Sequence, residues 1–239
     1  MNNKEYLEKY YKGNIIDAYK RLESGEPVQY IVGNVDFYGN KININKNVLI
    51  PRFETETLVE KTINYIKKYF DKDVDVLDIG TGSGCIAIAL KHEINCNIDA
   101  CDISDLALDV ARINAKENNC QINFYKSNFL DNIEKKYDVI ISNPPYISYN
   151  EEIEDIVKNN EPHLALYSDN NGLKSYEEII NNIEKNLKEK AIIAFEIGRT
   201  QGSYIKELIE KNLKDTKVFI EKDLSQNDRY VFAFYNINE

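Results

Sequence analysis

The sequence predicts an α/β fold in which a doubly wound, largely parallel sheet carries helices on both faces. From residue 75 onward, short apolar and β-branched segments alternate with longer amphipathic segments. A glycine-rich turn from Gly80 to Gly84 follows the first apolar segment directly. Strands that alternate with helices pair in parallel through right-handed crossovers, and such a turn is typical of the first strand-to-helix connection in these sheets.

The segments with strand character predict a seven-stranded sheet: 75–79, 97–101, 122–125, 137–142, 191–197, 217–221 and 229–235. Helices are expected over 85–92, 106–118 and 175–187, and one more is expected before the last two strands. Those two strands are too close in the chain for a helical crossover. We therefore expect them to form an antiparallel pair at the edge of the sheet.

The first part of the chain has a different character. Residues 3–23 carry apolar residues at helical spacing, interrupted by Gly13, and predict one or two short helices. From Val28 the segments VQYIVG, VDFYG and KININ are short, aromatic and β-branched, with a turn expected at Gly39-Asn40. An amphipathic helix is predicted over 55–70. We expect three parts: a short helical segment 1–26, a β-hairpin subdomain 27–54 and the sheet domain 55–239.

The composition is that of an ordinary globular protein, with 43% hydrophobic and 29% charged residues in 239. No stretch reaches the roughly 18 apolar residues of a membrane span, and no signal-peptide core is expected. The net charge of -10 argues against nucleic-acid binding, because duplex-binding proteins gather a basic face. Two histidines and no CxxC spacing predict no metal site. We expect a cytoplasmic protein with reduced cysteines: Cys85, Cys96, Cys101 and Cys120.

The glycine-rich turn predicts a ligand site at the carboxyl edge of the sheet. Gly80, Thr81, Gly82, Ser83 and Gly84 have the spacing G-x-G-x-G. Glycines allow a tight turn and close approach of a ligand to the backbone, and the amides at the following helix N-terminus face that ligand. A dinucleotide site favours glycine or alanine at position 85, where this chain has cysteine, so an NAD-dependent oxidoreductase is the weaker alternative.

Two aspartates strengthen the case for a ligand site. Asp102 ends the second strand, where an acidic side chain can accept hydrogen bonds from both hydroxyls of a ribose. Asp78 stands just before the glycines and could meet an ammonium group of the ligand, directly or through water. The alternative for Asp102 is that it only caps the next helix, as aspartates at strand ends often do.

Asn143, Pro144, Pro145 and Tyr146 follow the strand 137–142 at the same edge of the sheet. Two consecutive prolines form a stiff, extended bend, which fixes the Asn143 side-chain oxygen and the Pro144 carbonyl. Two acceptors so placed can take both hydrogens of a planar NH2 group, and Tyr146 offers it a face to stack on. The alternative is an ordinary Asn-Pro turn at a strand end.

These residues resemble the amino-methyltransferases that carry (Asp/Asn)-Pro-Pro-(Tyr/Phe). The wider sequence resembles the release-factor glutamine methyltransferases (the PrmC/HemK family of class I methyltransferases) from about Pro27 to Arg229. The segments that carry the resemblance stand in the family's order: PVQYIVG (27–33), FYG (37–39), VLIPRFETE (48–56), EPHLAL (161–166), FEIG (195–198) and Asp228-Arg229.

The resemblance implies a Rossmann-like methyltransferase that transfers a methyl group from S-adenosyl-L-methionine, releasing S-adenosyl-L-homocysteine, to the glutamine N5 in the Gly-Gly-Gln motif of bacterial peptide-chain release factors. It also implies a monomer. The residues implied at the cofactor are Asp78, Gly80, Thr81, Gly82, Ser83, Gly84, Asp102, Ile103, Asn128, Phe129 and Asn143. The residues implied at the substrate are Asn143, Pro144, Pro145, Tyr146, Phe37 and Arg52, the first four of them catalytic.

The chain departs from the family pattern in three places. The family's N-terminal helical domain, which would help to dock the protein substrate, is usually longer than the segment before Pro27. Phe53 replaces a proline, and we expect a small conformational change there. Asn128 stands where an aspartate is common, and its side-chain oxygen can still accept a hydrogen bond from the adenine amino group.

Other residues have plainer interpretations. Arg52 and Glu54 either orient the substrate or are simply solvated. His163 is expected to be structural, since a methylated amide nitrogen is acidic enough to lose its proton to water. Glu196 ends an apolar strand and can hydrogen-bond a neighbouring loop, without a catalytic role. The polar run 149–160 is expected to be a substrate-facing lid or a solvated helix.

Two further hypotheses remain at this stage. A DNA adenine-N6 or RNA guanine-N2 methyltransferase would use the same Pro-Pro loop on an exocyclic amine, but the acidic composition and the lack of a target-recognition domain speak against it. A binding module that keeps the cofactor pocket without turnover is disfavoured by the intact Asn143 motif.

Overall fold

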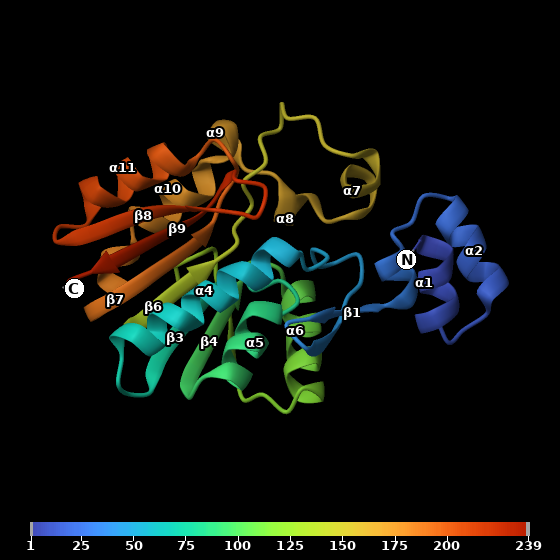
Figure 1. Cartoon of the computed structure of the whole chain (residues 1–239), viewed down its shortest axis with the longest axis horizontal. Coiled ribbons are helices and arrows are strands. Elements are labelled where there is room, and N and C mark those ends of the chain that lie inside the picture. Colours follow the sequence, from blue (N-terminus) through green and yellow to red (C-terminus); the bar gives the residue numbers. More distant parts are fainter. Residues whose placement is uncertain (1, 238–239) are drawn as a thin grey trace.

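Residues 2–237, the part of the chain that the computed structural model describes, form a helical N-terminal cluster, a two-stranded hairpin and a seven-stranded sheet (Figure 1). The order of strands in the sheet is β5-β4-β3-β6-β7-β9-β8. Its strands are β3 (Val74–Ile79), β4 (Cys96–Asp102), β5 (Asn123–Lys126), β6 (Tyr137–Ser142), β7 (Leu187–Glu196), β8 (Thr216–Lys222) and β9 (Asp228–Tyr235). The predicted doubly wound α/β fold is confirmed.

Strands β3 and β6 lie side by side at the centre of the sheet and run parallel, with Ile79 opposite Ser142. Every residue of β6 is buried. Parallel strands covered on both faces read as nearly continuous apolar runs, which explains why these two strands were so clear in the sequence. Both strands end at the same edge, so the segments that follow them meet there.

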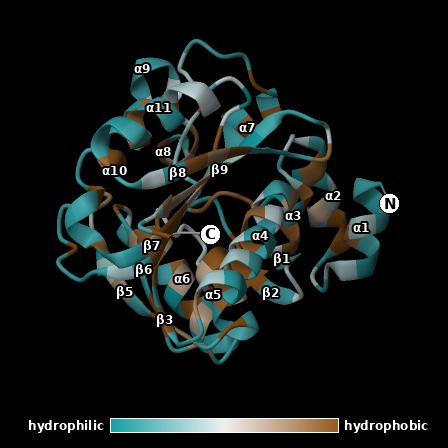
Figure 2. Ribbon diagram, turned by 60° about the vertical axis from the view of Figure 1, so that its left-hand side comes forward, coloured by the Kyte–Doolittle hydropathy of each residue, from teal (hydrophilic) through white to brown (hydrophobic). Residues whose placement is uncertain are grey.

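Helices cover both faces of the sheet (Figure 1). The helices α4 (Phe53–Tyr69), α5 (Cys85–Glu93) and α6 (Asp105–Glu117) lie over one face, and α10 (Lys174–Ile180) and α11 (Gly202–Asn212) lie over the other. Figure 2 shows hydrophobic residues concentrated on the strands and on the helix faces that meet them. Each fully buried aliphatic side chain in these layers contributes about 1.5–3 kcal/mol to stability.

The last two strands form the predicted antiparallel pair. β9 pairs antiparallel with β8 on one side and with β7 on the other. The antiparallel strand is thus inserted between β7 and the edge strand β8, which the short connection between β8 and β9 makes possible.

The N-terminal cluster consists of α1 (Asn3–Tyr10), α2 (Ile15–Glu23) and α3 (Val28–Val32). Its small core contains Leu7, Ala18, Val28 and Ile31. One or two short helices were predicted over 3–23, and the structure has two, α1 and α2, but the strand-like character of VQYIVG was misleading. That segment is one helical turn, because Pro27 precedes it and Gly33, in the left-handed region with φ 83°, ends it.

The hairpin is formed by β1 (Asn34–Phe37) and β2 (Asn40–Asn43). Its two-residue turn is Tyr38-Gly39, with φ 50° and 74°, so Asn40 already pairs with Phe37. The turn therefore lies one residue earlier than predicted. Two-residue hairpin turns favour positive φ at both positions because that twist matches the strands.

The helix predicted over 175–187 is interrupted. α10 ends at Ile180, the 3-10 turn η1 covers Ile183–Asn186, and β7 begins at Leu187, earlier than predicted. The Asn182 side chain donates to the Glu178 carbonyl (2.9 Å), and the buried Asn186 amide donates to the carbonyls of Ile133 and Lys135 (2.9 Å each). Side-chain amides that bond the backbone in this way compete with a continuing helix.

The segment after β6 contains three short helices: α7 (Asp155–Asn160), α8 (His163–Leu166) and α9 (Asp169–Gly172). The predicted polar run 149–160 is therefore an exposed loop followed by α7. Within the described part of the chain, no helix has both the length and the apolar character that a membrane crossing requires.

Candidate active site

A cavity of about 260 Å³ opens at the carboxyl edge of β3, β4 and β6. Its floor is the glycine-rich turn, and its walls come from the loop after β2 and from the segment around α8. Ten of the residues predicted at the site line it: Gly80, Thr81, Gly82, Ser83, Asp102, Ile103, Asn128, Phe129, Asn143 and Pro145. The structure thus brings together segments that are far apart in the sequence.

The glycine-rich turn is shaped to admit a ligand. Gly80 and Gly82 have φ 69° and 54°, and a Cβ atom built on either would meet no protein atom within 4 Å. The backbone amides of Gly80 and Thr81 donate to the Cys101 carbonyl (2.9 and 3.0 Å), which ties the turn to β4. The open space above the two glycines therefore belongs to the cavity, where the backbone can be approached closely.

Asp102 presents its carboxylate to the same cavity. Its two oxygens accept the backbone N–H groups of Gly82 and Ser104, each at 2.9 Å. Burial raises the pKa of Asp102, while the N–H donors of Ser104 and Gly82 act in the opposite direction. The residue that caps α6 is Ser104, whose hydroxyl accepts the Ala107 N–H. The helix-cap alternative for Asp102 is therefore wrong, and free lone pairs remain for a ligand.

Asp78 lies behind the turn and not in the cavity. Its side chain is fully buried and accepts the Thr81 hydroxyl at 2.6 Å, while its Oδ1 has no hydrogen-bond partner in the described structure. Burial raises the pKa of Asp78 to about 7. Because this carboxylate is fully buried and does not line the cavity, the arrangement favours an indirect contact with a ligand ammonium group.

Asn128 and Phe129 line the far end of the cavity, together with the half-exposed Ile103. The Phe129 backbone has φ 45°, and its carbonyl accepts the Cys101 thiol (3.4 Å). The Asn128 amide nitrogen lies 3.3 Å from Asp131 Oδ2, which leaves its oxygen free as an acceptor. Ile103 and Phe129 offer apolar surface to a flat group in the cavity, and the Asn128 oxygen offers it a hydrogen-bond acceptor.

The segment Asn143–Tyr146 follows β6 directly. The Asn143 side-chain N–H2 group donates to the Thr55 hydroxyl (3.1 Å), and this hydroxyl donates to Glu196 (2.7 Å). Asn143 and Pro145 line the cavity, whereas Pro144 is buried beside it. The arrangement leaves the Asn143 side-chain oxygen available to a group in the cavity.

Tyr146 turns away from the cavity. Its hydroxyl lies 3.4 Å from Glu196 Oε1, and its ring packs against the buried residues of the far layer. Gln201 Nε2 donates to the Tyr146 carbonyl (2.9 Å). The structure therefore places Tyr146 as an anchor of the loop, and it does not bring the ring to the position predicted for stacking.

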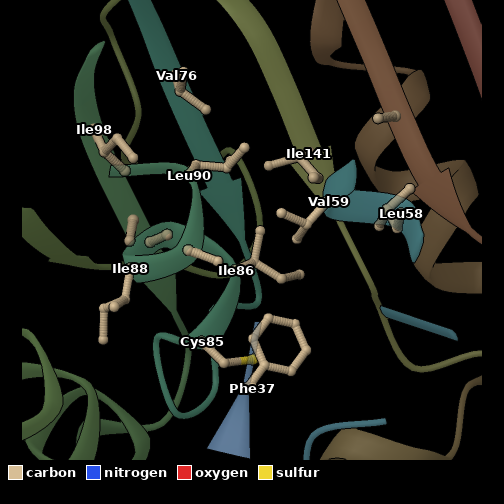
Figure 3. Close-up of a cluster of buried hydrophobic side chains, with 14 of the residues drawn as sticks. Phe37, Leu58, Val59, Val76, Cys85, Ile86, Ile88, Leu90, Ile98 and Ile141 are labelled. Atoms are coloured by element: carbon tan, nitrogen blue, oxygen red, sulfur yellow. The ribbon is translucent and has the colours of Figure 1, made fainter. Parts of the chain in front are cut away.

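Phe37 also fails to reach the cavity. Its side chain is 1% exposed and packs in the core beside Cys85, as Figure 3 shows. Cys85 lines the cavity, so Phe37 supports the wall from behind. Arg52 does not line the cavity either, because its guanidinium forms an ion pair with the buried carboxylate of Glu161, which also accepts the Ile50 N–H (3.0 Å).

His163 has a structural environment. Its Nε2 lies 2.8 Å from the Lys158 carbonyl, and its ring meets Tyr167 edge-on at 5.3 Å. His163 does not line the cavity. The prediction that this histidine is structural agrees with the geometry.

Several residues at the site were not among those predicted to form it. Thr55, from α4, bonds Asn143 directly and connects it to Glu196 at the end of β7, and both Thr55 and Glu196 are almost fully buried. Further residues come from the loop after β2 and from the segment around α8: Asn47, Val48, Leu49, Pro162, Leu164, Ala165 and Tyr167. Glu196 was expected only to hydrogen-bond a neighbouring loop, which agrees with its contact with the Tyr146 hydroxyl (3.4 Å), whereas its connection to Asn143 through Thr55 was not predicted.

Comparison with known proteins shows which family the chain belongs to. A family model described as the methyltransferase small domain matches residues 54–167. The chain is 44% identical over 218 residues to the release factor glutamine methyltransferase of Streptococcus pneumoniae, covering 90% of this chain and 77% of that protein. It is 40% identical over 225 residues to the one of Bacillus subtilis, covering 91% and 78%.

Solved structures agree with these relatives. A protein-(glutamine-N5) methyltransferase of Alicyclobacillus acidocaldarius, described as release factor-specific, superimposes with a TM-score of 0.50 at 25% identity, covering 81% of this chain and 98% of that chain. A methyltransferase of Pyrococcus furiosus, at 18% identity, superimposes with a TM-score of 0.62, covering 92% and 98%. The second likeness concerns the fold alone.

Proposed function

The chain belongs to the release factor glutamine methyltransferases, and from this premise we propose that it methylates the side-chain amide nitrogen, N5, of the glutamine in the Gly-Gly-Gln motif of a bacterial peptide-chain release factor. The methyl donor is S-adenosyl-L-methionine. The observation that carries the proposal is the placement of Asn143, whose side-chain oxygen is left free at the cavity.

The residues present fit the methyl donor. The open space over Gly80 and Gly82 suits the close approach of an amino-acid or ribose group. Asp102 can accept the hydroxyls of the ribose, and Ile103 and Phe129, which both line the cavity, offer apolar surface to a flat base. When bound, the donor supplies an electrophilic methyl group on a sulfonium. The glycine-rich turn and the end of β4 would hold the donor in the cavity.

The acceptor amide needs help because its nitrogen lone pair is delocalised into the carbonyl. We propose that Asn143 Oδ1 and the Pro144 carbonyl accept its two N–H groups, which turns the nitrogen toward the methyl group. The consecutive prolines keep both acceptors in place, so positioning and electrostatics lower the barrier. The proton is lost to water after transfer, so no protein base is required.

The parts outside the sheet domain suit a protein substrate. We propose that 55–239 performs catalysis, that the hairpin subdomain 27–54 walls the site, and that the helical segment 1–26 takes part in docking. The Asn160 side chain donates to the Gly25 carbonyl (3.1 Å), which ties α7 to the helical segment. Because the substrate is a translation factor, we place the reaction in the cytoplasm. A monomeric state and the absence of direct nucleic-acid contact stay predictions.

The test supplies labelled S-adenosylmethionine with either a release factor or nucleic acid. We expect label in the release factor alone. The Asn143→Ala variant should bind the donor with nearly unchanged affinity and transfer the methyl group at least about 10²-fold more slowly. Label in nucleic acid with none in the release factor would contradict the proposal. Undiminished methyl transfer by Asn143→Ala would show that Asn143 does not position the acceptor amide.

A further inference from the structure

Three side chains from separate elements form a continuous chain beside the cavity. Asn143 follows β6, Thr55 lies in the first turns of α4, and Glu196 ends β7. Asn143 Nδ2 lies 3.1 Å from Thr55 Oγ1, which lies 2.7 Å from Glu196 Oε2. Thr55 and Glu196 are 3% and 2% exposed, so water has little access to compete for these bonds.

The hydrogen bonds among these three side chains can run in only one direction when Glu196 is ionised. A carboxylate only accepts hydrogen bonds, so the single hydrogen of the Thr55 hydroxyl must go to Glu196. The Thr55 oxygen can then only accept, and it must receive the N–H of Asn143. The Asn143 oxygen is consequently directed away from Thr55. The reverse orientation of the amide would set its oxygen against a hydroxyl with no hydrogen to give.

We propose that Glu196 is a positioning residue that acts through Thr55 to fix the Asn143 side chain with its oxygen toward the acceptor amide. This inference rests on the proposed function, because it assigns that oxygen to the substrate NH2 group. The same carboxylate holds the other end of the loop, since its Oε1 lies 3.4 Å from the Tyr146 hydroxyl. One buried group thus orients both ends of Asn143–Tyr146.

The proposal predicts a pH-dependent active site. Burial raises the pKa of Glu196 to about 7, and Glu54 adds to this, whereas Arg229 and the hydrogen bonds from Thr55 and Tyr146 act in the opposite direction. A protonated Glu196 can donate to Thr55, whose hydrogen then points to Asn143. The Asn143 amide then rotates by half a turn and presents its N–H2 group to the substrate N–H2 group. Because two donors cannot hydrogen-bond each other, methyl transfer falls as the pH drops below about 7.

The first test removes the Thr55 hydroxyl at nearly constant volume. We expect Thr55→Val to lower kcat for release-factor methylation by about 10²-fold with a small change in KM, because orientation acts on the transition state. Thr55→Ser keeps the hydroxyl and should retain most of the activity. Thr62→Val is the matched control: Thr62 is fully buried in the same helix, and its hydroxyl donates to the Leu58 carbonyl (2.7 Å), its one hydrogen-bond partner among residues 2–237.

The second test changes the titrating group itself. Glu196→Gln cannot ionise and does not enforce one polarity, since its amide both donates and accepts. We expect its single-turnover rate to be lower than that of the wild type at pH 8 and flat from pH 8 to pH 6, while the wild-type rate falls. Thermal melting of each variant separates a loss of folding from a loss of orientation.

Two results would overturn the proposal. One is transfer by Thr55→Val at the rate of Thr62→Val. The other is a single-turnover rate of Glu196→Gln that falls from pH 8 to pH 6 as steeply as the wild-type rate does. Both results are differences between variants measured on a release factor that the wild type methylates. If the proposed function itself were wrong, the wild type would leave the release factor unmethylated, so the two failures can be told apart.

Discussion

Among the glycines of the described structure, Gly172 is the one at which an added methyl group would come closest to another atom, and that atom belongs to the active-site loop. Gly172 is buried, its φ is 82°, and a Cβ atom built on it would lie 2.0 Å from the Tyr146 carbonyl oxygen and 2.7 Å from Gln201 Nε2. Cβ atoms essentially never approach another heavy atom below 3.0 Å. In Gly172→Ala the Tyr146 carbonyl must therefore retreat by about 1 Å, or Gly172 must move by as much.

The expected loss follows from that displacement. A shift of about 1 Å in a group that positions the reacting atoms lowers turnover by about 10²-fold. The left-handed backbone adds a stability penalty of about 1–2 kcal/mol. Donor affinity should change little, because neither Gly172 nor Tyr146 lines the cavity. Single-turnover methylation of a release factor and calorimetric titration with S-adenosylmethionine measure the two quantities separately.

Gly25→Ala is the matched control for the backbone. Gly25 has φ 89°, and a Cβ atom there would meet nothing within 4 Å. It shares the conformational penalty without the collision, so its single-turnover rate at saturating release factor should stay close to that of the wild type. Equal rates for the two alanine variants would refute the reasoning, as would a loss of donor affinity in Gly172→Ala as large as its loss of turnover.

Three further predictions concern the surroundings of the site. Asp102→Ala should weaken S-adenosylmethionine binding about 10–100-fold in calorimetry, through lost charged hydrogen bonds; unchanged affinity would contradict its role. Burial raises the pKa of Asp78 from the ordinary 3.8 to about 7 in the folded protein, so wild-type stability relative to Asp78→Asn should fall by about 3 kcal/mol as the pH rises from 4 to 7; parallel melting curves would refute this. Arg52→Ala leaves the buried Glu161 carboxylate without its cationic partner and should lower the free energy of unfolding by about 3 kcal/mol, measured with denaturant. Adding Glu161→Gln should restore most of this loss; no recovery would count against the ion pair.

The parts of the site that were predictable are those written in short stretches of sequence. The turn from Gly80 to Gly84 and the segment Asn143–Tyr146 each follow a buried strand, and parallel strands end at one edge of a sheet. The ends of β3, β4 and β6 therefore had to meet once the strands were identified. The same logic placed Asp102 at the cavity.

The remaining parts depend on contacts between distant segments. Thr55 and Glu196 are 141 positions apart and meet because α4 packs across β7. No local pattern encodes such a meeting. Phe37 was expected at the substrate and packs behind Cys85, since a large apolar side chain gains more by burial than at a polar rim. The turn of α3 likewise depends on its contacts with α1 and α2.

The central claim is that the acceptor is the side-chain amide nitrogen of one release-factor glutamine. The most direct measurement is fragmentation mass spectrometry of a release factor after incubation with this protein and S-adenosylmethionine. We predict a single added methyl group on the side chain of the glutamine in the Gly-Gly-Gln motif, absent when Asn143→Ala replaces the wild type. A methyl group on any other residue, or an unmodified release factor beside methylated nucleic acid, would contradict the account.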